Sequence, residues 1–489
     1  MPSSSSPHME LEARSPRKTL ASGLASPWFQ VLFVAVVATL LYLFRLGTGA
    51  LLDWDEATYA QISREMSVSG NWLLPTWTHH PFFKKPPLIF WLQAGLFHCF
   101  GGSEFWARFP SAFAAVVVVV LVYIIARRLV SPSAGLFAAF SLMTMSHFDR
   151  AAREDMTDAL LCVCIFLAIY AWLRLRRDSP GWFYLLCASI GIGAMIKGPA
   201  VLVAPIAIAA DWLVTRNPGK VLPRRHYLFG TLLIFAIVAP WHIWMMVHFG
   251  YAFFHQYVDV ELGRRVSTDF EGSTGGPFYY FRFIFYGAFP WSVVSLIALG
   301  EWIRARNWSH SLIWILAGIV LIGYSLVPTR HQWYIVPVYP AVAIEVGRLL
   351  AETSDRWRLV RYAGIAVLAG GMIIAFIHLD RRRGDLFTNQ VAELAKAARG
   401  ANHRGPLLVI PAPGTDSQLA LPTAVFYSNR PAVFIAIPDD DGKLAHFVKT
   451  YNSMDAIIQD GAVSDLSKDY VIRLKAQNSS GNYAEISKR

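Results

Sequence analysis

The amino-acid sequence is dominated by apolar stretches that are long enough to cross a lipid bilayer. A helix rises about 1.5 Å per residue, so a hydrocarbon core of about 30 Å needs roughly 20 apolar residues. About eleven stretches approach that length. The sequence therefore predicts a mainly α, polytopic membrane protein with about 11 to 13 transmembrane helices, and the 16% charged content excludes an ordinary soluble protein. The stretches lie near 28–47, 107–126, 134–148, 157–173, 182–196, 199–214, 227–248, 281–299, 310–327, 334–350 and 361–378.

Basic residues indicate how these stretches are oriented. They gather in every second connection, as cytoplasmic loops do. The polar tail 1–27 is therefore predicted to be cytoplasmic, and an odd number of spans places segment 384–489 on the outer face. The net charge of +11 then mostly reflects topology, so no nucleic-acid partner is needed to explain it. The residues concerned are Arg14, Arg17, Lys18, Arg127, Arg128, Arg174, Arg176, Arg177, Arg216, Lys220, Arg224, Arg225, Arg304, Arg306, Arg356, Arg358 and Arg361.

Three further features narrow this prediction. The apolar run 88–101 is too short for a comfortable span and would break the alternation, so it is interpreted as an interfacial or re-entrant helix. The first stretch follows a polar lead without a small-residue cleavage site, which predicts a retained span rather than a signal peptide. All four cysteines lie in apolar segments, which argues against a disulfide framework or a thiol metal cluster.

The first predicted outer loop, 48–106, combines acidic and aromatic residues. A helix over 56–67 is expected to be amphipathic and to lie on the membrane. Asp53 is interpreted as an N-cap of that helix, because Asp accepts a hydrogen bond from a free backbone N–H. For Asp55, which stands beside Glu56, capping and chemistry both remain open.

The same loop contains the paired cations Lys84 and Lys85, followed by two prolines that prevent a helix. A single lysine at this depth is explained by snorkelling of its ammonium group. Two lysines on the outer side run against the positive-inside trend. The pair therefore favours binding of a lipid phosphate.

The other predicted outer loops offer fewer candidates. In and after loop 149–156, Asp158 begins an apolar helix, where burying a carboxylate is costly and functional roles are enriched. Lys197 is explained by helix termination and snorkelling. Loop 249–280 is rich in glycine without phosphate-loop spacing, which predicts a mobile segment closing over a site. No paired-histidine motif is present, so no metal site is predicted.

The polar segment 384–489 has a different character. Apolar runs near 406–411, 423–428, 432–437 and 469–475 alternate with helical candidates near 387–399 and 442–451. This pattern predicts a small extracytoplasmic α/β domain.

An ordered series of motifs resembles the bacterial GT-C glycosyltransferases. Within that class the sequence is similar to the 4-amino-4-deoxy-L-arabinose lipid A transferases and the dolichyl-phosphate-mannose protein mannosyltransferases. The resemblance covers about residues 45 to 345 and implies a transmembrane catalytic domain, 28–380. It rests on Asp53-Trp54-Asp55-Glu56, Tyr59, Arg64-Glu65-Met66, Gly70-Asn71-Trp72, Pro75, Lys85-Pro86-Pro87, Trp91, Arg108, Arg153, Asp158, Lys197-Gly198-Pro199, Pro240-Trp241, Gly276-Pro277-Phe278-Tyr279-Tyr280, Pro290-Trp291, Tyr334, Pro337, Tyr339 and Pro340.

The resemblance implies roles for individual residues. Asp55 would be the catalytic carboxylate and Asp158 the acid of the second loop, with Asp155 as its fallback. Lys85 would bind the phosphate of a polyprenyl-phosphate-linked sugar. The relatives commonly have an acidic residue where this chain has Lys84, which leaves open a basic acceptor pocket or a different sugar. The remaining substrate-binding candidates are Glu56, Tyr59, Arg64, Lys84, Arg264 and Arg330.

The implied reaction transfers a sugar from a polyprenyl phosphate, such as undecaprenyl phosphate, to a lipid, glycan or protein acceptor at the outer face of the inner membrane. It would proceed by one inverting displacement, and whether a divalent cation assists stays open. Two rivals remain. A lipid or glycolipid flippase predicts charges deep within spans or interrupted helices at repeat-related positions, and a silent sensor or scaffold predicts no chemistry.

Overall fold

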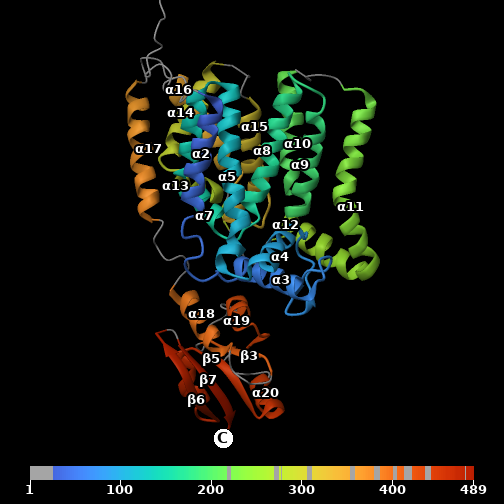
Figure 1. Ribbon diagram of the computed structural model, residues 1–489, viewed down its shortest axis with the longest axis vertical. Helices are drawn as coiled ribbons and strands as arrows, with labels where there is room; N and C mark the ends of the chain where they lie inside the picture. The colour runs from blue at the N-terminus through green and yellow to red at the C-terminus, as the bar shows by residue number, and fades with distance from the viewer. Residues whose placement is uncertain are drawn as a thin grey trace, which may run out of the picture.

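A computed structural model describes residues 26–216, 222–268, 275–276, 278–305, 311–352, 358–378, 386–399, 405–411, 421–435, 442–479 and 481–489 (Figure 1). Each predicted apolar stretch contains helix, so the mainly helical, polytopic architecture is confirmed. The helices are α2 (Pro27–Leu43), α5 (Glu104–Leu129), α6 (Pro132–Met143), α8 (Asp158–Leu175), α9 (Trp182–Lys197), α10 (Val203–Thr215), α11 (Arg224–Phe254), α13 (Tyr279–Gly287), α14 (Trp291–Ala305), α15 (Ser311–Leu326), α16 (Val338–Glu352) and α17 (Arg358–His378).

Length and composition decide which helices can cross a bilayer alone. Among the described residues, five helical stretches are long and apolar enough, and a sixth is added if α13 and α14, bent by 109°, count as one span. Five shorter apolar helices accompany them. The total number of spans therefore stays a prediction.

Polar contacts show that α9 and α10 run in opposite directions. Lys197, the last residue of α9, meets Asp158 at the first residue of α8. Asp211, near the end of α10, meets Arg176 at the other end of α8. The chain therefore reverses in the 3-10 turn Gly198–Leu202 between them.

Small residues allow the centre of the bundle to pack closely. A Cβ atom added to Gly347 of α16 would lie 2.4 Å from the Ala134 carbonyl oxygen of α6. One added to Gly135 would lie 2.7 Å from the Tyr123 carbonyl oxygen of α5. In a membrane, where lipid is as apolar as leucine, such close backbone approach is a main source of helix association.

Three short helices gather at one end of the bundle (Figure 1). They are α3 (Asp55–Ser69), α4 (Leu88–Phe100) and α7 (Ser146–Arg153). The helix expected over 56–67 is present as α3, and most of its residues are buried between α4 and the C-terminal segment. Polar side chains are paired inside these contacts, as where the Ser63 hydroxyl donates to the Gln93 side chain over 2.6 Å.

The region predicted as loop 249–280 is largely helical. A π-helix (His255–Arg264) and α12 (Arg265–Ser267) continue from α11, which kinks at Gly250, where φ is 49°. Most of the glycine-rich stretch, 269–274 and 277, lies outside the described residues.

The C-terminal segment lies against α3 at the same end of the molecule (Figure 1). A mixed sheet, in the order β4-β3-β5-β7-β6, is parallel on one side of β5 and antiparallel on the other. The run 423–428 is a buried helix, α19 (Leu421–Ser428), because it packs between this sheet and α3. The other elements are α18 (Leu386–Ala398), β3 (Leu407–Ile410), β4 (Ala432–Phe434), α20 (Lys443–Tyr451), β5 (Ser453–Ile458), α21 (Asp460–Leu466), β6 (Tyr470–Asn478) and β7 (Gly481–Lys488).

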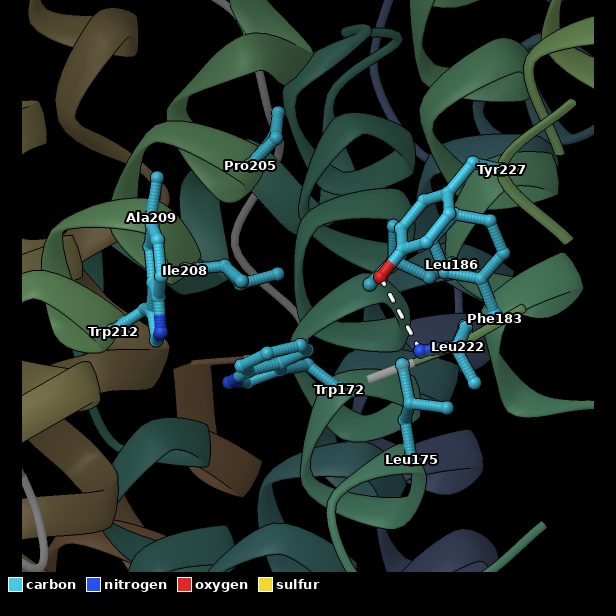
Figure 2. A pocket seen from close by; sticks show the side chains of 10 residues that line it. All are labelled: Trp172, Leu175, Phe183, Leu186, Pro205, Ile208, Ala209, Trp212, Leu222 and Tyr227. Atoms are coloured by element: carbon cyan, nitrogen blue, oxygen red, sulfur yellow. Dashed lines mark hydrogen bonds between the residues drawn. The ribbon is translucent and has the colours of Figure 1, made fainter. Parts of the chain in front are cut away.

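A cavity of about 360 Å³ lies between α8, α9, α10 and α11, near the end of α8 remote from α3 (Figure 2). Its lining is apolar and aromatic, with Trp172, Trp212 and Tyr227 among the side chains. None of the predicted acidic or basic site residues lines this cavity. Asp55, Lys85 and Asp158 lie instead at the α3 end of the bundle.

Candidate functional site

Asp55 stands at the start of α3, where its carboxylate meets two predicted partners. The Tyr59 hydroxyl, one turn later, donates to Asp55 Oδ1 over 2.6 Å. Lys85 Nζ lies 3.7 Å from the same oxygen and also donates to the Tyr59 hydroxyl. Tyr59 therefore links the carboxylate to the ammonium group.

A second acid and base pair joins this group from the bundle. Lys197 Nζ lies 2.6 Å from Asp158 Oδ1, and the carboxylate is 2% exposed. The same ammonium group lies 5.4 Å from the centre of the Tyr334 ring. The two residues come from the facing ends of α9 and α8, so they meet only because these helices pack antiparallel.

A third cation approaches from the helical segment after α11. Arg265 Nη1 donates to the Tyr334 hydroxyl over 3.0 Å, and its Nε donates to Glu261 Oε2 over 2.9 Å. Tyr334 thus touches both Lys197 and Arg265, so residues far apart in the chain form one cluster.

The electrostatics of Asp55 tie the cluster together. Burial alone would raise the pKa of Asp55, but nearby cations and the Tyr59 hydroxyl hold that pKa below its ordinary value. The cations are Lys85, Lys197 and Arg265. Burial also lowers the pKa of Lys85, with Asp55 opposing this effect. Asp55 is therefore ionised at neutral pH and lies in a positive field.

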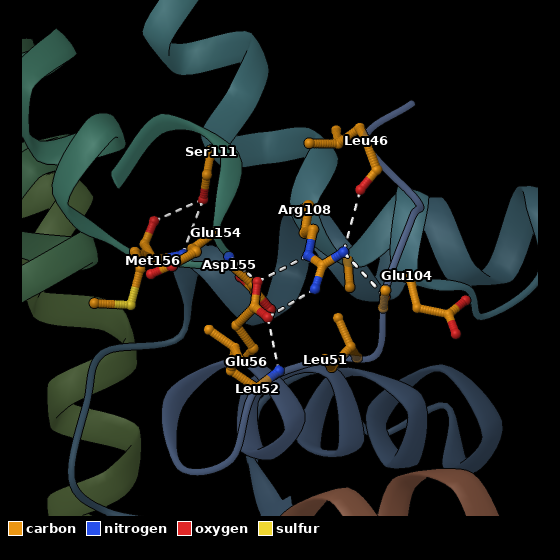
Figure 3. A network of polar contacts seen from close by, with 12 residues as sticks. Leu46, Leu51, Leu52, Glu56, Glu104, Arg108, Ser111, Glu154, Asp155 and Met156 are labelled. Atoms are coloured by element: carbon orange, nitrogen blue, oxygen red, sulfur yellow. Dashed lines mark hydrogen bonds and ion pairs between the residues drawn. The ribbon is translucent and has the colours of Figure 1, made fainter. Parts of the chain in front are cut away.

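Glu56, the residue after Asp55, belongs to a buried network of polar contacts (Figure 3). Arg108 Nε and Nη2 each donate over 2.9 Å to one oxygen of Glu56. The same guanidinium donates to the Leu46, Thr48, Gly49 and Ala50 carbonyls, so it holds the loop that leads into α3.

Glu56 needs correction as a substrate-binding candidate. It is 2% exposed, and besides Arg108 it accepts hydrogen bonds from the Leu52 and Asp155 backbone amides. Its oxygens are occupied, so it supports the turn rather than facing a substrate. Burial and Glu56 raise the pKa of Asp155 well above its usual range, which makes Asp155 a poor substitute for Asp158.

Arg64 also has a different role from the one predicted. Its guanidinium lies 3.7 Å from the centre of the Phe426 ring and donates to the Phe426 carbonyl. It therefore binds α3 to α19. Burial lowers the pKa of Arg64 to about 10.

Three other candidates lie outside the cluster of contacts. Arg264 and Lys84 are exposed. Arg330 donates to the Ser325 carbonyl at the end of α15 over 3.1 Å. Asp53 is not the N-cap of α3, because it accepts from the backbone amide of Thr423 in the first turn of α19 over 3.0 Å. Asp53 therefore accepts a hydrogen bond from a backbone N–H at the start of a helix, as predicted, but that helix is α19 rather than α3.

Three residues of the cluster were not predicted as site residues from the sequence: Lys197, Glu261 and Arg265. Lys197 belonged to a motif of the resemblance, yet alone between two spans it looked like an ordinary helix end. The sequence could not favour Arg265 over Arg264, because the segment was predicted as a loop. In a loop, unlike a helix, the sequence does not indicate which of two neighbouring side chains faces the site.

The arrangement suits an anionic ligand beside a carboxylate. Fixed cations stabilise negative charge best where water is partly excluded, and Asp55 can orient or deprotonate a second reactant. Among the residues that the structure describes, no three His, Cys, Asp or Glu side chains gather as a metal site.

The chain is similar to several known proteins in sequence. A family model described as dolichyl-phosphate-mannose-protein mannosyltransferase matches residues 84–244. An uncharacterized protein from Aquifex aeolicus is 26% identical over 66% of the chain and 64% of its own length. An undecaprenyl phosphate-alpha-4-amino-4-deoxy-L-arabinose arabinosyl transferase from Erwinia tasmaniensis is 30% identical over 64% of the chain and 58% of its own length. The chain therefore spans less than two thirds of these relatives.

The fold matches over nearly the whole chain. The crystal structure of ArnT from Cupriavidus metallidurans bound to undecaprenyl phosphate has a TM-score of 0.78 at 20% identity. The match covers 94% of this chain and 98% of that one, so it includes the C-terminal segment. In sequence and in fold, the chain resembles the polytopic GT-C glycosyltransferases, and among them the aminoarabinose transferases and the dolichyl-phosphate-mannose protein mannosyltransferases.

Proposed function

We propose that the chain is an inverting glycosyltransferase of the inner membrane. It moves a sugar, either 4-amino-4-deoxy-L-arabinose or a hexose, from undecaprenyl phosphate or another polyprenyl phosphate to an envelope acceptor such as lipid A. The α3 end of the bundle and the C-terminal segment face the periplasm, and the N-terminus is cytoplasmic. The observation that carries the proposal is the ion pair of Asp55 with Lys85, 3.7 Å apart at one end of the bundle, where Lys197 and Arg265 also lower the pKa of Asp55.

The proposed reaction uses the two charges of this cluster separately. The acceptor oxygen attacks the anomeric carbon, and the bond from that carbon to the phosphate oxygen breaks. The polyprenyl phosphate leaves with the electron pair, and the cations stabilise its developing charge. A hydroxyl acceptor gives its proton to Asp55, whereas a phosphate acceptor has none to give and Asp55 only orients it.

Lys85 and Lys84 are given different roles in this proposal. Lys85 contacts Tyr59 and lies near Asp55, so it holds the donor phosphate. Lys84 is exposed at the rim and meets an anionic acceptor. Arg264 and Arg330 remain proposed contacts of the bound substrates, made from the edge of the cluster.

The flippase alternative is less well supported. The acids and bases of the cluster lie at helix ends, such as Asp158 and Lys197, rather than in the middle of spans. An interrupted span does occur, α13 with α14, but within the described part of the chain it is the only such pair. Alternating access between repeats predicts a second one at a corresponding position.

Replacing the two lysines separately tests their roles. We expect Lys85→Met to raise the KM for the polyprenyl-phosphate donor by about 10- to 100-fold, because a charge-assisted contact is lost. Lys84→Met should change the acceptor KM and leave the donor KM within about twofold. Steady-state kinetics with each substrate varied in turn measures both, and Lys468→Met, at an exposed ion pair, is the matched control. Equal effects of both variants on the donor KM would contradict the assignment.

The pH dependence follows from the cations around Asp55. Ionised Asp55 is required, so activity should persist down to a pH below the ordinary pKa of an aspartate and fall as Asp55 is protonated. Its ion pair also stabilises the fold above the unfolded pKa, a contribution lost as the pH falls through the lowered folded pKa. Lys85→Met removes the largest of the effects that lower the pKa of Asp55, so the acid limb of the kcat/KM profile should move to higher pH. A limb that stays in place would show that another group controls it.

The transferase proposal itself is tested in cells. Mass spectrometry of envelope lipids and glycans from a deletion strain should reveal one missing sugar, restored by the wild-type chain but not by Asp55→Asn. If no sugar is missing, the proposal fails.

A further inference from the structure

The turn that presents Asp55 is strained and is held from the C-terminal segment. Trp54, immediately before Asp55, has φ of 70° and ψ of −104°, a region that residues other than glycine rarely adopt. Its side chain is 56% exposed, so side-chain packing does not account for this conformation. Such strain persists only where the surrounding structure fixes the backbone on both sides, and it clusters at functional sites.

Helix α19 supplies one of these attachments through Thr423. The Thr423 backbone amide and hydroxyl both donate to Asp53 Oδ1, and the hydroxyl also lies 3.3 Å from the Leu51 carbonyl oxygen. Thr423 is fully buried. The residue just before Trp54 is therefore fixed by a side chain that lies hundreds of residues later in the sequence.

Tyr427, one turn further along α19, holds the same loop. Its hydroxyl accepts from the Leu51 backbone amide over 2.9 Å and donates to Glu104 Oε1 over 3.0 Å. Arg64, stacked on Phe426, attaches the middle of α3 to the same helix. From the opposite side, Arg108 holds the carbonyls of the loop. The chain on both sides of Trp54 is thus clamped between α5 and α19.

We propose that α19 is part of the transfer machinery, with Thr423 and Tyr427 as positioning residues for Asp55. The proposal rests on the transferase function above. Neither residue touches the reacting atoms. Both set where the Asp55 carboxylate stands relative to Tyr59 and Lys85, because they hold the strained turn in place. The C-terminal α/β segment is then required for the chemical step as well as for stability.

Kinetics can separate positioning from a merely structural role. Thr423→Val keeps the shape and removes the hydroxyl, and a misplacement of about 1 Å can cost on the order of 100-fold in rate. We expect kcat to fall by about 10- to 100-fold while the donor KM stays within about twofold, because the cations remain. Thr423→Ser, which restores the hydroxyl, should recover most of the lost kcat. The matched control is Thr450→Val on the exposed face of α20, which should match the wild type.

Amide exchange gives a readout that does not depend on activity. The Ala57 and Thr58 amides donate to the Leu52 and Trp54 carbonyls, so they report on the turn. They should exchange faster in Thr423→Val than in Thr450→Val. Tyr427→Phe, which removes the other hydroxyl, should reproduce both effects and serves if Thr423→Val does not fold.

The outcomes separate this inference from the proposed function. If the wild type releases no polyprenyl phosphate, the transferase proposal fails, and exchange at Ala57 and Thr58 alone decides whether α19 holds the turn. If the wild type is active but Thr423→Val and Tyr427→Phe keep its kcat and exchange rates, the inference is overturned. A lower melting temperature with unchanged kcat also overturns it, since α19 would then only stabilise the fold.

Discussion

Asp55→Asn is expected to lower the rate of sugar transfer by about 10²- to 10⁴-fold, the usual contribution of a positioned acid or base. The asparagine can still accept a hydrogen bond from Tyr59, so the geometry of α3 should survive. Only the negative charge is lost, and with it the capacity to take a proton. Binding of polyprenyl phosphate should persist, because Lys85, Lys197 and Arg265 keep their charges.

Single-turnover kinetics in nanodiscs, combined with a binding measurement for polyprenyl phosphate, distinguishes these effects. Asp465→Asn in the C-terminal segment is the matched control, since that residue belongs to an exposed ion pair. Full transfer activity of Asp55→Asn would contradict the assignment of Asp55 as the catalytic carboxylate.

Arg108→Met should have the largest effect on stability. The substitution leaves Glu56 as a buried carboxylate without its counter-ion, a change that typically costs about 3–5 kcal/mol. It also removes the donor for four backbone carbonyls of the loop before α3. We expect a correspondingly lower free energy of unfolding in detergent, together with loss of activity because Asp55 is no longer held.

The double variant Glu56→Gln/Arg108→Met isolates the charge. It should be less unstable than Arg108→Met alone, because no unpaired ion remains inside the protein. Arg473→Met on β6 is the control, an exposed position where a change within about 0.5 kcal/mol is expected. A loss below about 1 kcal/mol in Arg108→Met would contradict the assigned role of the network.

The helical architecture was predictable because bilayer thickness sets a minimum length for the apolar stretches that span it. Each apolar stretch became helix, and the charged candidates of the first outer loop were found at the α3 end of the bundle. The central pair of the site was also within reach, since the resemblance singled out Asp55 and Lys85. These two residues lie on one loop, so their proximity needed little tertiary information.

Other partnerships could not be inferred from local sequence. Lys197 meets Asp158 only through antiparallel packing of α8 and α9, and Asp53 meets Thr423 only after the C-terminal segment has folded against α3. From the local sequence, snorkelling explains Lys197 well, and capping of the following helix explains Asp53 well. Both residues instead make tertiary contacts, because a buried polar group pairs with whichever partner the packing brings near.

Glu56 is the opposite case, a residue predicted to bind substrate that has a structural role. It stands next to Asp55, one residue into a helix, and carries the same carboxylate group, so the local sequence does not distinguish the two residues. The helical turn nevertheless directs its carboxylate toward Arg108 and the bundle, whereas Asp55 faces Tyr59 and Lys85. Adjacent residues on a helix point about 100° apart, so neighbouring carboxylates can serve structure and chemistry separately.

The most direct test of the central claim follows both products of one reaction. Purified wild-type chain in liposomes receives a polyprenyl-phosphate sugar labelled in both the sugar and the lipid, together with extracted envelope lipids as acceptor. We expect one polyprenyl phosphate to be released for each sugar transferred, and release by Asp55→Asn to be reduced by at least about 100-fold. Movement of the intact labelled lipid across the bilayer without release of polyprenyl phosphate would contradict the transferase proposal and identify a flippase.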